Sequence, residues 1–258
     1  LDFSMSSATF NKQNTGCEIC QRTLSFDFSY AYQPLVDVVN REIWGYEALV
    51  RGTEGQSAWS VLKQVNDDNR YAFDQSCRTK AIALASQLKL DKVLSINFLP
   101  NAVYVPKNCI QSTLKAADEH QFPIDKIMFE ITESEEVLDR KHLKNIFEHY
   151  KKQGFITAID DFGEGHAGLN LLANFLPKVV KIDIELVRDI DQSPVKQVIA
   201  KHFVEMCHEL DITVLAEGVE RIEEANYFKS LGVWLMQGYL FAKPGFQCLP
   251  SVDFSCLD

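Results

Sequence analysis

The segment ITAIDDFGEGHAGLNLL, residues 156–172, decides how the rest of the chain is interpreted. It begins as a β-branched apolar run typical of a strand, breaks at the adjacent acids Asp160 and Asp161, and passes through a glycine-rich turn into a helical pattern. In a parallel α/β protein, the carboxyl end of a strand faces the rim where active sites form. Adjacent carboxylates repel each other unless a cation or a proton lies between them. The segment therefore predicts a metal site, and the alternative is a turn with one solvated acid.

Length, charge and hydropathy favour one large globular domain. The 258 residues fit an α/β barrel. The net charge of −10 argues against a surface for polymeric nucleic acid, but a small phosphorylated ligand is compatible if metal ions reverse the local field. No apolar run approaches the ~20 residues of a membrane span, so no membrane insertion is expected. No secretory signal is visible, and Leu1 at the start leaves room for an upstream segment.

The seven cysteines are an odd number, scattered through apolar segments and near both ends. We interpret Cys77, Cys109 and Cys207 as reduced core thiols, which favours a cytoplasmic protein. Cys17 and Cys20 form a CxxC ahead of the first expected strand. This pair has either a metal or redox role or none, because half a zinc ribbon still needs two more ligands.

The order of elements predicts the fold. Residues 1–27 lack periodicity and are interpreted as an N-terminal tail or cap. Residues 29–39 and 42–50 predict strands joined so tightly that they must be antiparallel, and Pro34 indicates an edge or a bulge. Further strands are expected at 93–99, 126–132, from 156, 179–184, 212–217 and 233–237, with helices at 59–66, 71–88, 108–120, 141–153, 195–210 and 222–231. This alternation predicts an α/β fold, a modified (β/α)8 TIM-type barrel with an antiparallel strand at its start, over residues 28–246, followed by a C-terminal tail, residues 247–258.

A polar residue lies near the end of nearly every expected strand. These residues are Glu47, Asn97, Glu130, Asp160 with Asp161, Lys181, Glu217 and Gln237. Carboxylates gathered at one rim are costly unless they bind cations or share protons. Oxygen ligands select Mg²⁺ or Mn²⁺ over Zn²⁺, and two such ions a few ångströms apart are a common device for attacking phosphate esters. The five histidines on expected helices are interpreted as surface residues: His120, His142, His149, His202 and His208.

Eight motifs in order give the chain a family resemblance. They are YQP (32–34), YEALVR (46–51), SINFLP (95–100), FEITE (129–133), AIDDFG (158–163), KIDI (181–184), LAEGVE (215–220) and MQGYLFAKP (236–244). The chain resembles the EAL domain family of cyclic di-GMP phosphodiesterases over about residues 30–245. The resemblance implies hydrolysis of cyclic di-GMP to linear pGpG by a water activated by two divalent cations, Mg²⁺ or Mn²⁺. It also implies a homodimer paired near the DDFG loop.

The resemblance assigns a role to each matched residue. The first metal would be held by Glu47, Asn97, Glu130 and Asp160. Asp160 would bridge to the second metal, which Asp161 also binds, with Glu217 acting directly or through water. Lys181 would orient or deprotonate the attacking water, so the catalytic set is Lys181, Glu47, Asp160 and Glu217. The dinucleotide would contact Gln33, Arg51 and Gln237, and Glu133 would tie down the loop after Asp161.

Other interpretations of the same residues stay open. The main alternative is a catalytically silent EAL domain that acts as a cyclic di-GMP receptor or a protein-interaction module, and a generic metal-assisted phosphatase is a second. A kinase is excluded because the chain lacks the glycine-rich loop and the catalytic loop that accompany DFG in kinases. Glu164 and His166 depart from the family's loop pattern, where small, hydroxylated and aromatic residues are usual. They therefore bear on the order of that loop and on dimerisation more than on metal binding.

Overall fold

A tight turn joins the first two strands, β1 (Ser29–Asp37) and β2 (Glu42–Arg51), and makes them antiparallel. Asp37 Oδ1 closes the turn by accepting hydrogen bonds from the backbone N–H groups of Val39 and Asn40 at 2.9 and 2.8 Å. So short a connection cannot hold the crossover that parallel strands require. The strand register shifts between Leu35 and Val36, directly after Pro34, so the predicted antiparallel start and bulge are both confirmed.

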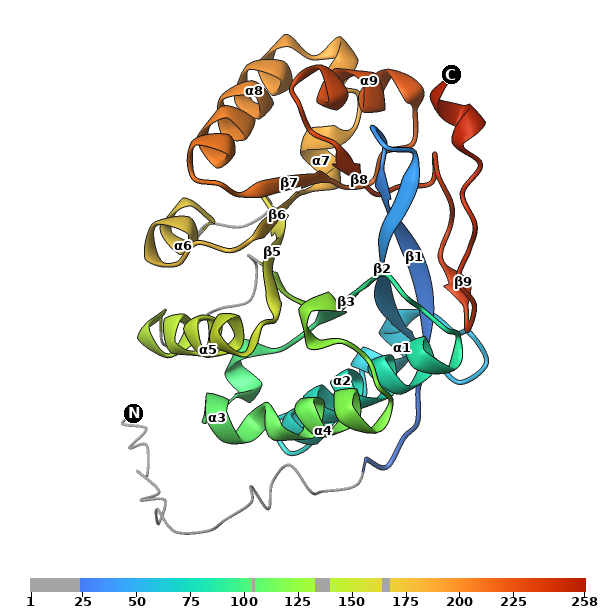
Figure 1. Ribbon diagram of the computed structural model, residues 1–258, viewed down its shortest axis with the longest axis vertical. Coiled ribbons are helices and arrows are strands. Elements are labelled where there is room, and N and C mark those ends of the chain that lie inside the picture. The colour runs from blue at the N-terminus through green and yellow to red at the C-terminus, as the bar shows by residue number, and fades with distance from the viewer. Residues whose placement is uncertain (1–23, 104, 133–139, 164–167) are drawn as a thin grey trace, which may run out of the picture.

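The remaining strands complete a closed barrel in which this hairpin forms part of the wall. The computed structural model describes residues 24–103, 105–132, 140–163 and 168–258. The further barrel strands are β3 (Val93–Asn97), β4 (Ile127–Thr132), β5 (Ile156–Phe162), β6 (Val179–Ile182), β7 (Thr213–Ala216) and β8 (Leu235–Met236). From β2 to β8 each strand pairs in parallel with the next, and β1 pairs antiparallel with both β8 and β2. The predicted modified (β/α)8 barrel is confirmed (Figure 1).

Helices surround the barrel (Figure 1). They are α1 (Ala58–Leu62), α2 (Arg70–Gln87), α3 (Pro106–Cys109), α4 (Gln111–Glu119), α5 (Arg140–Gln153), α6 (Gly168–Asn174), α7 (Ile184–Val187), α8 (Pro194–Glu209) and α9 (Ile222–Ser230). The expected strand 179–184 ends early because Asp183 caps α7, accepting a hydrogen bond from Glu185 N at 2.8 Å. The expected helix 108–120 is two shorter helices, and the expected strand 233–237 narrows to β8.

Apolar side chains fill the barrel interior beneath its mouth. One buried cluster takes a single residue from each of six strands: Leu35, Met128, Ala158, Val179, Leu215 and Leu235. Side chains two residues apart on a strand point to the same face. The residues two positions nearer the mouth therefore also point inward, and they are Gln33, Glu130, Asp160, Lys181, Glu217 and Gln237. An apolar layer thus supports a polar layer directly above it.

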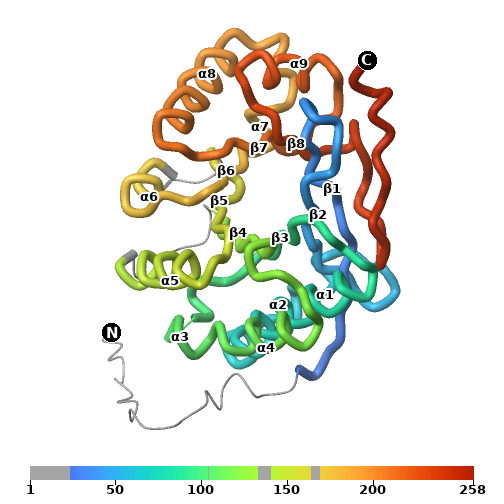
Figure 2. The backbone as a smooth tube through the Cα atoms, in the orientation of Figure 1, coloured from blue at the N-terminus to red at the C-terminus, as the bar shows by residue number. Residues whose placement is uncertain are grey.

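The C-terminal segment runs along the outside of the β1–β2 hairpin (Figure 2). A short strand, β9 (Gly245–Phe246), pairs with Ala31 and Tyr32 of β1. Farther on, the Pro250 carbonyl oxygen accepts a hydrogen bond from the Tyr46 hydroxyl at 2.8 Å. This segment covers a part of the barrel wall where the tight β1–β2 turn leaves no room for a helix. Among the described helices, none has the length and apolarity needed to cross a membrane.

Candidate active site

Lys181 lies at the centre of the barrel mouth, and carboxylates surround it. Its side chain is only 1% exposed, and its Nζ lies within 3.5 Å of oxygens on four acids. The distances are 2.6 Å to Glu217, 2.9 Å to Asp160, 3.1 Å to Glu130 and 3.5 Å to Glu47. These acids come from β2, β4, β5 and the end of β7. The structure thus brings together five of the residues that the sequence predicted for the site.

Asp161 joins this cluster through a break in the regular strand. Consecutive residues of a strand normally point to opposite faces, so Asp160 and Asp161 could not both face the mouth. The register of β5 shifts between Ile159 and Phe162, and Asp161 has φ 52°, in the left-handed region. This conformation is costly for a residue other than glycine and is concentrated at functional sites. It brings an oxygen of Asp161 within 4.8 Å of oxygens on Asp160 and Glu217.

Two groups of oxygen atoms therefore share one residue. In the first, oxygens of Glu47, Glu130 and Asp160 lie within 4.8 Å of one another; in the second, those of Asp160, Asp161 and Glu217 do. The two groups contain acids that the sequence assigned to two metal sites, and Asp160 is the residue that they share. Asn97 adjoins the first group, since its Nδ2 donates to Glu47 Oε1 at 2.9 Å.

Amide side chains orient Glu47. Gln237 Nε2 donates to Glu47 Oε2 at 2.8 Å and also lies 3.2 Å from Gln33 Oε1. Gln33 Nε2 in turn donates to the Ala242 carbonyl oxygen at 3.2 Å. The network links β1, β2 and the chain after β8. It holds Glu47 Oε2, the same oxygen that lies 3.5 Å from Lys181 Nζ.

The electrostatics of the cluster favour added positive charge. The pKa of Glu130 is raised to about 8 by burial and by the nearby Glu47 and Asp160 carboxylates, although Lys181 opposes the rise. Burial and Asp160 raise the pKa of Glu217 well above its ordinary value. Burial alone would lower the pKa of Lys181, but its carboxylate neighbours raise it well above the usual range, so the amine keeps its proton. One ammonium faces several acids, and a divalent cation would offset the remaining repulsion.

The other predicted residues either do not contact this cluster or lie outside the residues that the structure describes. Arg51 ends β2, half-buried, and its Nη1 donates to the Val50 carbonyl oxygen at 2.7 Å. The residues outside the described ranges are Cys17, Cys20, Glu133, Glu164 and His166. Of the five helical histidines, His202 and His208 are exposed, and the other three are half-buried. The three thiols predicted for the core, Cys77, Cys109 and Cys207, are buried.

The cleft above the cluster includes residues that sequence reasoning missed. It has a volume of about 390 Å³, and its lining adds Asp183, Arg188, Glu220 and Tyr239 to the predicted Gln33, Glu47, Asp161, Glu217 and Gln237. Asp183 follows Lys181 by two residues and could have been found from the strand alternation. Arg188 and Tyr239 lie beyond strand ends, where no periodicity indicates which residues face the mouth.

A comparison of the whole sequence with models of protein families points to the same family as the motifs. The model of the EAL domain family matches residues 18–244. The chain belongs to the EAL domain family. The resemblance predicted from the motifs is thereby confirmed.

Curated relatives of this EAL domain include two proteins of Escherichia coli K12. The chain is 32% identical over 234 residues to the blue light- and temperature-regulated antirepressor BluF, covering 90% of this chain and 58% of that protein. It is 26% identical over 258 residues to the probable cyclic di-GMP phosphodiesterase PdeD, covering 96% of this chain and 46% of that protein. The chain spans about half the length of these relatives.

Solved structures of other EAL proteins resemble this EAL domain closely. A standalone versatile EAL protein from Vibrio cholerae O395, in a c-di-GMP-bound form, is 57% identical with a TM-score of 0.88, covering 90% of this chain and 99% of that chain. The manganese/cy-diGMP complex of Klebsiella pneumoniae BlrP1 is 35% identical with a TM-score of 0.81, covering 88% of this chain and 58% of that chain. Both support the barrel fold.

Proposed function

We propose that this EAL domain is a cyclic di-GMP phosphodiesterase that hydrolyses its substrate to linear pGpG with two Mg²⁺ or Mn²⁺ ions. The observation that carries the proposal is the pair of oxygen groups that share Asp160 around a buried lysine. Two hard ions held by a shared carboxylate suit attack on a phosphodiester. Relatives named as cyclic di-GMP phosphodiesterases and a neighbour solved with manganese and cyclic di-GMP support the same assignment.

The residues of the site fit such ions. Every candidate ligand offers oxygen, which is the donor that Mg²⁺ and Mn²⁺ prefer. Glu130 Oε1 is buried and meets no donor among the described residues with good hydrogen-bond geometry, and the nearby Ser95 hydroxyl interacts only weakly with this carboxylate. A buried carboxylate oxygen without a partner is costly, and a cation would satisfy it. When bound, two ions would lower the pKa of a water molecule and neutralise charge on the phosphate.

The chain's own residues would supply orientation and charge. Lys181 keeps its proton and would orient the attacking water between Asp160 and Glu217, with which it already pairs. Gln237 and Gln33 would fix the angle at which Glu47 faces the first ion, and we assign them with Arg51 to substrate contact. The reduced core thiols suit a cytoplasmic location, which we include in the proposal.

A receptor without catalysis is the second candidate. It is favoured by the similarity to BluF, which is named as an antirepressor. The two functions differ in one measurement, because a receptor binds cyclic di-GMP without releasing product.

Metal dependence tests the enzyme directly. We expect hydrolysis of cyclic di-GMP with Mg²⁺ or Mn²⁺, its loss in EDTA, and its recovery when either ion is returned in excess. Chromatographic detection of linear pGpG provides the measurement, and a panel of linear dinucleotides and simple phosphate esters provides the control for substrate class. Full activity in metal-free buffer would contradict the two-metal site, and tight binding without product would favour the receptor.

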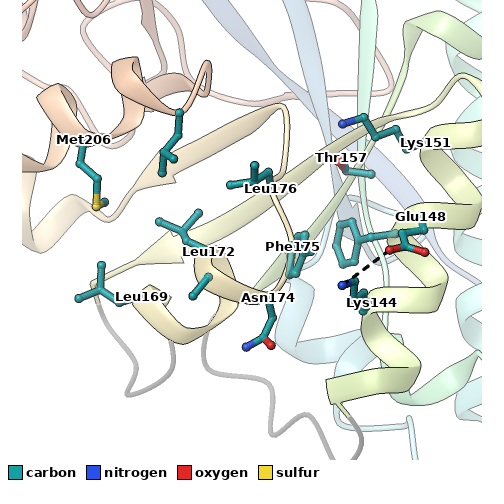
Figure 3. A pocket seen from close by; sticks show the side chains of 13 residues that line it. Lys144, Glu148, Lys151, Thr157, Leu169, Leu172, Asn174, Phe175, Leu176 and Met206 are labelled. Atoms are coloured by element: carbon teal, nitrogen blue, oxygen red, sulfur yellow. Dashed lines mark ion pairs between the residues drawn. The ribbon is translucent and has the colours of Figure 1, made fainter.

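A groove on the outer wall supports the proposed homodimer. It has a volume of about 620 Å³ and lies between α5, α6 and α8, and none of the side chains that line it (Figure 3) also lines the cleft at the barrel mouth. Leu169, Leu172, Phe175, Leu176 and Met206 give it an apolar lining. Leu169 and Leu176 are 65% and 49% exposed, and with the other lining residues they form a contiguous apolar surface that a partner could cover. Its place beside the chain that follows DDFG agrees with the dimer contact that the resemblance implies.

Charge in this groove should weaken the dimer. We expect Leu169→Asp to shift the protein toward monomer, because a carboxylate repeated across a two-fold contact is both repulsive and desolvated. Sedimentation velocity over a range of protein concentrations measures the shift. Leu62→Asp is the matched control, since Leu62 is 46% exposed on α1, far from the groove. Equal sedimentation of the two variants and the parent would place any dimer contact elsewhere.

A further inference from the structure

A buried ion pair lies behind the ends of β3 and β4. Asp74 and Arg78 are one turn apart on α2, with Arg78 Nη2 2.7 Å from Asp74 Oδ2 and both side chains at most 1% exposed. Arg78 Nη1 also donates a hydrogen bond to the Tyr150 hydroxyl of α5 at 2.7 Å. Replacing such a pair with apolar residues is often neutral or stabilising. Stability is therefore a weak explanation for it, and its contacts suggest another.

The guanidinium of Arg78 packs against the immediate neighbours of two candidate metal ligands. Its central carbon lies 5.2 Å from the ring centroid of Phe98 and 5.2 Å from that of Phe129. Phe98 follows Asn97 and Phe129 precedes Glu130 in the sequence. The two rings meet edge-on at 5.7 Å, and Phe98 N donates to the Glu130 carbonyl oxygen at 3.1 Å. One buried cation thus supports the backbone of both ligands.

Asp74 holds the chain on the far side of Asn97. Its Oδ1 accepts a hydrogen bond from Leu99 N at 2.9 Å. Asn97 is the last residue of β3 and its side chain is exposed, so the strand fixes it from one side only. The bond to Leu99 anchors the chain two residues later, after it has left the sheet. Gln75, 3.4 Å from Asp74 Oδ2, adds a second hydrogen bond to the carboxylate.

We propose that Asp74 and Arg78 are positioning residues that aim Asn97 and Glu130 at the first metal ion. The inference rests on the proposed function, because it takes those two side chains as metal ligands. Arg78 holds the rings and Asp74, and Asp74 holds the Leu99 amide. Partners behind metal ligands commonly change metal affinity when they are lost, without touching the ion themselves.

A matched pair of double variants isolates this role. Asp74→Leu with Arg78→Met removes both charges and the acceptor for Leu99 N, whereas Asp74→Asn with Arg78→Met removes the charges but keeps a side-chain oxygen there. Neither leaves an unpaired buried charge. We expect the leucine variant to bind Mn²⁺ roughly 10- to 100-fold more weakly than the parent, and the asparagine variant, which keeps the acceptor for Leu99 N but lacks the Arg78 guanidinium, to fall between the two. Titration calorimetry without substrate measures the affinity, and thermal unfolding in EDTA measures stability.

Kinetics and controls separate positioning from simple loss of stability. Saturating Mn²⁺ should restore most of the kcat of the leucine variant and leave KM for cyclic di-GMP unchanged. Val204→Ala, a buried truncation on α8, should lower the unfolding temperature without changing Mn²⁺ affinity. If the leucine variant does not fold, Leu99→Pro removes the same amide donor and is expected to weaken Mn²⁺ binding likewise.

The outcomes distinguish this inference from the proposed function. A parent protein that binds no Mn²⁺ overturns both. The positioning role alone is overturned if the parent binds Mn²⁺ and the folded leucine variant, or Leu99→Pro, binds it with equal affinity. The positioning role is also overturned if the leucine variant loses no more Mn²⁺ affinity than Val204→Ala does.

Discussion

Replacing Lys181 with methionine is expected to lower kcat by about 10²- to 10⁴-fold at saturating Mn²⁺, with KM for cyclic di-GMP close to the parent value. Methionine keeps most of the side-chain volume but removes an ammonium that lies 2.6 Å from Glu217 and 2.9 Å from Asp160. Because the group is buried beneath the cleft, it is placed to act on the attacking water more than on the bases of the dinucleotide. Steady-state kinetics with pGpG detection measure both constants.

The same variant should behave differently once the ions are removed. In EDTA it lacks both the ions and the ammonium that offsets part of the repulsion among the four surrounding acids, so we expect the free energy of unfolding to fall by about 3–5 kcal/mol. Excess Mn²⁺ should recover much of this loss. Lys178→Met is the matched control, because Lys178 lies at the opposite end of β6 with a side chain 57% exposed. A raised KM with kcat intact would show that Lys181 binds substrate instead.

The alternation of strand residues explains why so much of the site could be predicted. In five of the six strands that supply the apolar layer, the inward-facing polar residue follows an apolar residue by two positions, as Glu130 follows Met128 and Asp160 follows Ala158. A side-chain period of two fixes which face points inward, and the parallel direction fixes which end is the mouth. In β1, which runs the other way, the order reverses, and Gln33 precedes Leu35.

Features that depend on contacts between distant segments could not be predicted in this way. The left-handed backbone of Asp161 is set by its surroundings, and the DD pair alone does not reveal that both acids reach the mouth. The ion pair of Asp74 and Arg78 looks like an ordinary i, i+4 surface pair in the sequence. Only packing against β3, β4 and α5 makes it buried. The place of the C-terminal segment beside Tyr46 likewise depends on a contact 204 residues apart.

Asp160 and Asp161 are neighbours in the sequence, but their replacement should have different effects on metal binding. Asp160 belongs to both oxygen groups, whereas Asp161 belongs to the second alone. Asp160→Asn is expected to abolish high-affinity binding of both Mn²⁺ ions, with a loss of kcat on the order of 10³-fold or more. Asp161→Asn should remove one ion and leave the other. Titration calorimetry with Mn²⁺ gives the two stoichiometries directly.

Asparagine is a suitable replacement because its side-chain oxygen can still accept the Asp161 N–H, which lies 3.1 Å from Asp160 Oδ1. The backbone of the bulge should therefore be kept, and the change falls mainly on charge. Glu220→Gln provides the control, since Glu220 lines the same cleft but belongs to neither oxygen group. Equal losses in Asp160→Asn and Asp161→Asn would mean that the two ions bind as one cooperative unit. Retention of both ions by Asp160→Asn would rule out the bridging position, because no neutral amide replaces a carboxylate shared between two divalent charges.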